Sequence, residues 1–399
     1  MSVPGAVPYH RLSLTPDHRW WRPVLGTTFV FFVWFLAMMV VSILAGGAGA
    51  VAGRPDGPDG TPTFGDAGDT ALSLIMLGTG IPVVLLGARA IQRRRPGTLS
   101  SVTGRLRRRW LGTCLLASLA ALMLSLVLMA LLVGLTSGTA PEDDGDLVRP
   151  GDFALSMALI LPVLPLQTSA EEYLCRGWLL QAVGSLYRGI WPALLVQAVV
   201  FTALHGFGTV WGVIDLMVFA LLTGWLTIRT GGLEAALALH FVNNLVGFTM
   251  SAAFGELASE ETAADSSWQM ALVDTVVLTL FAAAVLGLAA RRGLDRTGVP
   301  APVHGRADPQ VSPTPWPLTG QALTAADATP ATGTTVGTPA STGEAVPVSA
   351  GGWTLPGSDP WAAPGGTGAA EPAGPQTPQA PGHRGTRDLP GPFATGDGR

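Results

Sequence analysis

The chain has no lysine, only two cysteines and few charged residues. All 23 basic residues among its 399 residues are arginine, which we interpret as a coding bias. Charged residues make up 13% of the chain. A soluble domain carries nearer a quarter. Cys114 and Cys175 have no plausible sequence partner, so we expect neither a disulfide framework nor a CxxC metal knuckle. The mean hydropathy of +0.41 indicates a membrane protein.

The sequence also lacks the motifs of several soluble enzyme classes. No HExxH zincin helix, GxSxG elbow, P-loop or Rossmann fingerprint is present. The arginine-rich stretch 93–109 raises the question of nucleic acid, but beside an apolar span such a loop more simply marks the cytoplasmic side and attracts anionic lipid. We therefore expect the lipid bilayer, and no nucleic acid, as a partner.

Apolar stretches predict an all-α, polytopic membrane bundle of about eight transmembrane helices. About 20 apolar residues cross about 30 Å of hydrocarbon. The first stretch is long enough to span and follows a polar segment, so it is expected to be a helix and not a signal peptide. The predicted spans cover roughly residues 23–46, 70–90, 110–136, 154–175, 190–206, 211–229, 232–253 and 268–290.

Loop charges predict the orientation of this bundle. Arginines gather before the first span, at 93–109 and after the last span, whereas acids gather in the alternate loops. Because cytoplasmic loops carry the positive charge, both termini are expected in the cytoplasm. The arginine-only, GC-biased composition suggests a bacterial cell membrane. The predicted parts are a cytoplasmic segment (1–22), a transmembrane domain (23–298) and a disordered Pro/Gly/Ala/Thr-rich cytoplasmic tail (299–399).

Three ionisable residues interrupt the fourth span. Glu171, Glu172 and Arg176 lie within six residues, although an ionised side chain at bilayer depth costs at least about 2.5–3.5 kcal/mol. Glu172 and Arg176 are four apart, so we expect them to pair on one helix face. Glu171 points elsewhere and stays available as a general base. Taken alone, the motif fits a buried pair that only braces two helices equally well.

Two more polar motifs follow in later spans. His205 closes Phe201-x-x-x-His205, and His240 and Asn244 share a helix face. The second pair can donate hydrogen bonds to one developing oxyanion, although helix packing also uses such residues. Of six histidines, only His205 and His240 fall within predicted spans, which favours a functional site.

Three other acids receive structural interpretations. We expect Asp215 to cap the sixth span. Glu234 fits the first turn of the seventh span, where the helix dipole favours a carboxylate. Asp274 has no evident partner in the sequence and is expected to face a cavity or pair within the bundle.

In order, Glu171-Glu172-x-x-x-Arg176, Phe201-x-x-x-His205 and His240-x-x-x-Asn244 resemble the EExxxR, FxxxH and HxxxN motifs of the CPBP family. This is the CAAX prenyl endopeptidase and bacteriocin-processing group of intramembrane proteases, also called Abi. The resemblance covers about residues 150–250. It implies a CPBP-type intramembrane glutamic endopeptidase whose substrate is a membrane-associated peptide or protein.

The resemblance also implies a role for each motif residue. Glu171 would activate water, with His205 holding or sharing the proton. His240 and Asn244 would form the oxyanion hole, and Glu172 and Arg176 would orient the site. No cofactor is expected. Two histidines and a glutamate can in principle bind zinc, but they lack the fixed helical spacing of a zincin, so a metal-free mechanism is favoured.

The topology creates a tension between Glu171 and His205. Their spans run in opposite directions, so the two residues meet only if the fourth helix is long or tilted. We therefore predict one continuous helix from about 154 to 184, with Glu171 well inside the membrane beside a water-filled cavity.

Two other classes of function fit the same residues. The alternative to the protease is a non-catalytic membrane scaffold or immunity protein built on the same fold. A transporter that uses Glu171, Glu172 and Arg176 as a relay is less favoured, because no convincing internal repeat is present. The sequence leaves open the substrate, its prenylation, the metal dependence, the role of the tail and the oligomeric state.

Overall fold

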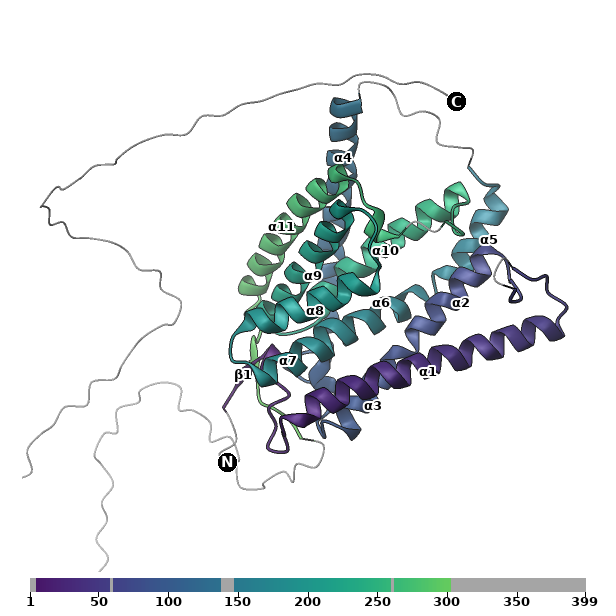
Figure 1. Cartoon of the computed structure of the whole chain (residues 1–399). Coiled ribbons are helices and arrows are strands. Elements are labelled where there is room, and N and C mark those ends of the chain that lie inside the picture. The colour runs from purple at the N-terminus through teal and green to yellow at the C-terminus, as the bar shows by residue number, and fades with distance from the viewer. Residues whose placement is uncertain (1–4, 58–59, 138–146, 260–261, 303–399) are drawn as a thin grey trace, which may run out of the picture. The chain divides into compact units, whose positions relative to one another are not determined.

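The computed structural model describes residues 5–57, 60–137, 147–259 and 262–302, and these are mainly helical (Figure 1). The predicted tail, apart from residues 299–302, lies outside the described residues. The first helices are α1 (Trp21–Val51), α2 (Asp66–Gly78), α3 (Gly80–Ala90), α4 (Arg108–Ser137) and α5 (Pro150–Ile160). The later ones are α6 (Leu164–Glu172), α7 (Leu180–Leu186), α8 (Ile190–Leu204), α9 (Val210–Thr230), α10 (Glu234–Phe254) and α11 (Trp268–Arg291).

All eight predicted spans are helical, which confirms the fold class of a multi-pass membrane bundle. Six are long and apolar enough to cross a bilayer, with α2 and α3 together forming one of them. The fourth predicted span is a bent pair of helices and would make a seventh. The fifth, α8, has 15 residues, a length of about 22 Å that falls short of the hydrocarbon thickness.

The fourth span is not the continuous helix that the sequence predicted. Helix α5 ends at Ile160, α6 begins at Leu164, and the two axes differ by 41°. Pro162 and Pro165 account for the break, because proline lacks an N–H donor and its ring clashes with the preceding helical turn. The prediction of one continuous helix over 154–184 was therefore wrong at residues 161–163, whereas its continuation past Arg176 is confirmed, because helical residues run from Leu164 to Leu186.

A second irregularity lies in the same span. Between α6 and α7, residues Tyr173–Leu179 form a π-helical segment, η3, and every residue in it is buried. A π-helical turn is wider than an α-helical turn and is frequent at functional sites. Here it carries Arg176, so the helix that presents Glu171 and Glu172 changes its winding directly after them.

The loops meet at two ends of the bundle. At one end, the N-terminal segment, the loop 91–107, the turn 231–233 and the segment 292–302 are joined by backbone contacts. These include the antiparallel strands β1 (Val7–Pro8) and β2 (Thr297–Gly298), and bonds from Val102 N to Gly231 O and from Arg95 N to Ala301 O. At the other end, Val148 N donates to Ala253 O. This alternation matches the predicted separation of basic and acidic loops, and which end faces the cytoplasm stays a prediction.

Two packed groups of helices frame the site. Helices α4, α9 and α11 lie side by side and share a buried core with α10 (Figure 1). A larger core joins α1, α3, η3, α7, α8 and α9. Helix α6 packs against α2 and α10, which brings the fourth and seventh predicted spans together at the polar residues.

Candidate active site

Glu172 sits at the centre of a buried charge cluster. Its Oε1 accepts hydrogen bonds from Arg176 Nη1 at 3.0 Å and His240 Nδ1 at 2.8 Å. The side chains of Glu172 and Arg176 are fully buried, and that of His240 is 3% exposed. The pairing of Glu172 with Arg176 four residues later is confirmed. A buried carboxylate needs such cationic partners, because desolvation is costly without them.

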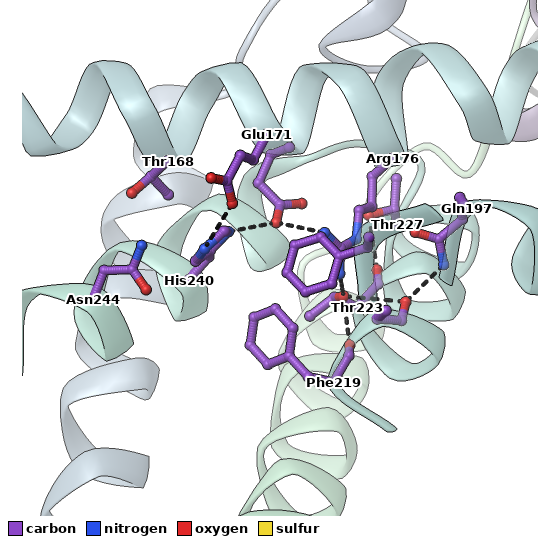
Figure 2. Close-up of polar contacts among 12 residues, drawn as sticks. Thr168, Glu171, Arg176, Gln197, Phe219, Thr223, Thr227, His240 and Asn244 are labelled. Atoms are coloured by element: carbon purple, nitrogen blue, oxygen red, sulfur yellow. Dashed lines mark hydrogen bonds and ion pairs between the residues drawn. The ribbon is translucent and has the colours of Figure 1, made fainter. Parts of the chain in front are cut away.

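Arg176 is fixed from three further sides (Figure 2). Its Nη2 donates to Thr223 Oγ1 on α9 at 2.7 Å. Its guanidinium lies 4.2 Å from the ring centre of Phe201 and 5.5 Å from that of Phe219, within the range of cation–π attraction. Arg176 therefore ties the π-helical segment to α8 and α9 and holds Glu172 in place.

Glu171 has a different environment from its neighbour. Its Oε1 accepts a hydrogen bond from Gln167 Nε2 at 2.5 Å. Its Oε2 lies 3.5 Å from His240 Nε2 and 4.0 Å from His205 Nε2. This Oε2 is buried and accepts no hydrogen bond from the described residues. The carboxylate oxygen thus faces two imidazole nitrogens at distances longer than a normal hydrogen bond.

Both histidines are oriented by their Nδ1 atoms. His205 caps the C-terminus of α8 and its Nδ1 lies 2.8 Å from Phe201 O. Because a carbonyl only accepts, Nδ1 of His205 carries the hydrogen and Nε2 of the neutral ring is bare. The same reasoning applies to His240, whose Nδ1 faces Glu172. For His240 Nε2 to donate as well, the ring must hold both protons.

The predicted tension between the two spans is resolved by helix lengths. Glu171 lies fifteen residues before the end of α7, and His205 lies fifteen residues after the start of α8. Both helices meet at the turn 187–189, so the two residues are each about 20 Å along the chain axis from the same turn. Opposite chain directions therefore bring them to a similar distance from that turn.

A cavity of about 100 Å³ adjoins this cluster, large enough for several water molecules. Its walls include His205, His240 and Asn244, while Glu171 is not among the residues that line it. Asp215 and Asp274 also line it, and Asp274 Oδ1 accepts a hydrogen bond from Ser125 Oγ at 3.2 Å. The prediction that Asp215 caps the sixth span was wrong, because the Thr209 side chain caps the N-terminus of α9.

All six predicted site residues therefore come from α6, η3, the end of α8 and α10, and lie around one centre. The sequence missed Gln167, which contacts both Glu171 and Asn244, and Thr223, which binds Arg176. Both could be noticed in the sequence as polar residues within apolar spans. Gln167 lies one helical turn before Glu171, and Thr223 lies on another helix, opposite Arg176. Among the described residues, no group of three or more His, Cys, Asp and Glu side chains is arranged to hold a metal ion.

The same region carries the similarity to known proteins. Residues 153–246 match the family described as type II CAAX prenyl endopeptidase Rce1-like. The resemblance to the CPBP family is thus confirmed over this Rce1-like segment, which contains all six site residues. The similarity supports a protease-like function of the CAAX type.

Comparison with a curated relative and with solved structures gives less information about function. The chain is 39% identical over 97 residues to "Uncharacterized protein YyaK" of Bacillus subtilis (strain 168). This alignment covers 23% of the chain and 32% of the relative, so the chain spans about a third of that relative's length. No solved structure matches the chain.

Proposed function

We propose that the protein is an intramembrane endopeptidase that hydrolyses a peptide bond of a membrane-associated peptide or protein with water activated by Glu171 and His205. The observation that carries the proposal is the convergence of Glu171 Oε2, His205 Nε2 and His240 Nε2, with separations of 3.5 and 4.0 Å from the carboxylate oxygen. A water molecule between these atoms has the two to four polar partners that a bound water needs.

In the proposed reaction, Glu171 accepts a proton from this water while the oxygen attacks the scissile carbonyl carbon. The carbonyl oxygen becomes an oxyanion and receives hydrogen bonds from His240 Nε2–H and the Asn244 amide. When the tetrahedral intermediate collapses, the C–N bond breaks and the proton passes through His205 to the leaving amine. No covalent enzyme intermediate forms.

The ionisable groups of this scheme form a connected set. Glu172 bonds Arg176 and His240, and Glu171 lies within ion-pair distance of His240. Such partners are needed where carboxylates are desolvated. Glu172 and Arg176 act by positioning His240, which supports the predicted orienting role.

The mechanism proposed needs no metal, and a chelator tests that part alone. Incubation of purified protein with a membrane-permeant chelator, followed by dialysis, is expected to leave cleavage unchanged. A loss of cleavage that added zinc restores would replace water activation by Glu171 with metal catalysis and would contradict this mechanism.

We also propose that the basic end of the bundle faces the cytoplasm of a bacterial cell, with both termini there. The clustering of the arginine-rich loop 91–107 with segment 292–302 supports this orientation. A reporter that is active only in the cytoplasm should work when fused after residue 302 and fail when inserted between residues 138 and 146. The reverse pattern would overturn the orientation.

The function is tested in cells, because the substrate is unidentified. A strain that lacks the protein and a strain that carries Glu171→Gln should accumulate the same membrane precursor, and the wild type should not. Asp152→Asn is the matched control, since Asp152 is an exposed carboxylate on α5 that pairs only with Arg149 in the described structure. If Glu171→Gln behaves like the wild type while the deletion has a phenotype, the non-catalytic scaffold or immunity function is supported instead.

A further inference from the structure

One glutamine connects the two halves of the proposed site. Gln167 lies on α6, one turn before Glu171, and is 5% exposed. Its Nε2 donates to Glu171 Oε1 at 2.5 Å, and its Oε1 accepts from Asn244 Nδ2 at 3.1 Å. The Thr168 hydroxyl also donates to Oε1, at 3.2 Å. The carboxamide therefore bridges the water-activating carboxylate on α6 and the proposed oxyanion donor on α10.

The direction of these bonds follows from the carboxylate. An ionised Glu171 only accepts hydrogen bonds, so Gln167 must turn its NH₂ group towards it. The oxygen of Gln167 then faces Asn244, which must turn its own NH₂ group towards Gln167. Asn244 is left with one N–H hydrogen that is not engaged by Gln167. An amide has two nearly equivalent orientations, and the oxygen of Gln167 selects the one in which the NH₂ group of Asn244 faces it.

We propose that Gln167 is a positioning residue that sets the amide orientation of Asn244 and holds Glu171 by Oε1, so that Oε2 faces the two histidines. This inference rests on the proposed function. The glutamine touches neither the attacking water nor the scissile carbonyl in the proposed reaction. Its effect on hydrolysis passes through Asn244 and Glu171.

A simpler explanation is a helix-stabilising pair, because Gln167 and Glu171 are four residues apart. Such pairs contribute about 0.2–0.5 kcal/mol on exposed helix surfaces. Gln167 is buried, however, and its oxygen is used by a residue 77 positions away on another helix. Both ends of the carboxamide are thus occupied by residues of the proposed site, which a local helix contact does not require.

The experiment compares two buried glutamines. Gln167→Met removes both hydrogen bonds at nearly constant volume, and Gln197→Met makes the same change at a fully buried glutamine whose Nε2 donates only to the backbone oxygens of Leu194 and Ala220. The probe is the precursor that accumulates in the Glu171→Gln strain, added to proteoliposomes that contain each variant. Gln167→Met should lower kcat about 10- to 100-fold and change KM less than about threefold. Gln197→Met should retain kcat.

Two further variants distinguish a positioning role of Gln167 from a packing role. In a double-mutant cycle, Gln167→Met combined with Asn244→Ala should lose less kcat than the product of the two single losses, because part of the effect of Gln167 passes through Asn244. Gln167→Glu, which keeps the size and cannot donate an N–H to Glu171, should lose kcat as well.

The results that overturn the inference are distinct from those that overturn the function. Normal kcat in Gln167→Met or Gln167→Glu, with Glu171→Gln inactive, removes the positioning role and leaves the protease intact. Additive losses in the cycle have the same meaning. Full cleavage by Glu171→Gln removes both proposals.

Discussion

Two buried Arg–Glu pairs lie in different parts of this bundle, and they are satisfied to different degrees. At the basic end, Arg107 binds Glu234 through Nη2, Nε and its backbone N–H, at 2.7, 2.9 and 2.8 Å. Both oxygens of Glu234 are occupied. In the candidate site, Glu172 uses Oε1 for Arg176 and His240, while Glu172 Oε2 and Arg176 Nε have no hydrogen-bond partner among the described residues.

The difference separates a structural pair from a chemical one. A fully bonded buried carboxylate fixes two segments and has no capacity left for a ligand. An incompletely bonded cluster costs stability, and such costs concentrate at functional sites. The first pair joins the loop 91–107 to the start of α10, and the second lies beside Glu171 and the cavity. Burial of charge alone does not identify a site, whereas an unfilled polar atom beside histidines does.

The largest effect is expected where the unfilled oxygen belongs to the proposed base. Glu171→Gln should lower kcat/KM by about 10²–10⁴-fold, which is the usual contribution of general-base catalysis, because the amide cannot accept the proton from water. The thermal midpoint in detergent should change little, because Glu171 is outside the Arg176 pair. Cleavage at more than a tenth of the wild-type rate would show that Glu171 is not the base. The proposed difference between Glu171 and the Arg107–Glu234 pair would then be lost.

The opposite profile is expected at the basic end. Glu234→Ala leaves Arg107 partly buried without its anion and should lower the free energy of unfolding by about 3–5 kcal/mol. Activity per folded molecule should stay within about threefold of the wild type. Denaturant unfolding followed by tryptophan fluorescence measures the first quantity, and the cleavage assay measures the second. A large loss of kcat in a folded Glu234→Ala protein would show that the two pairs are not separate in function.

Glu172→Gln should lie between these two extremes. The neutral amide cannot balance the charge of Arg176 and weakens the contact that orients His240, so kcat should fall about 10- to 100-fold and stability should fall as well. Thr227→Val, which removes a buried hydroxyl that bonds only Thr223 O, serves as a control for lost polar contacts nearby. An unchanged kcat in Glu172→Gln would assign His240 orientation to other contacts.

The sequence predicted the ion pair of the candidate site because the spacing of its two residues is local. The i, i+4 relation of Glu172 and Arg176 produced the correct ion pair, and apolar length placed all eight helices. It could not predict that Arg107 binds Glu234 or that Gln167 bridges to Asn244, because those partners are 127 and 77 residues apart. Helix-dipole reasoning placed Glu234 correctly in the first turn of α10 but gave no reason for its burial.

The errors in backbone prediction have a similar cause. Pro162 and Pro165 were visible in the sequence, yet the need to bring Glu171 to His205 favoured one long helix. The π-helical segment η3 has no signature in composition, because it depends on packing against other elements. The proximity of Glu171 and His205 results from the continuation of the fourth span to Leu186 together with the length of α8, which bring both residues to a similar distance from the turn 187–189.

The smallest predicted effect extends the comparison to histidines. His240 has carboxylates near both ring nitrogens, whereas no ion pair to His10 occurs among the described residues. Burial, together with the charge of Arg11, lowers the pKa of His10 from 6.5 to about 4. The unfolded chain therefore binds a proton near pH 6.5 that the folded protein refuses until about pH 4, so stability falls as the pH is lowered through this window.

Between pH 6.5 and 5.5 this linkage corresponds to a loss of about 1 kcal/mol in the free energy of unfolding. His10→Phe should flatten the pH dependence by that amount, while His18→Phe, which replaces a less buried histidine of the same segment whose pKa is also lowered, should flatten it less. Unfolding curves at closely spaced pH values measure both. His10 packs against Gly184 of α7. If the pH dependence of the free energy of unfolding is unchanged in His10→Phe, then acid acts on another group. In that case the proposed contrast between His10 and His240 is lost.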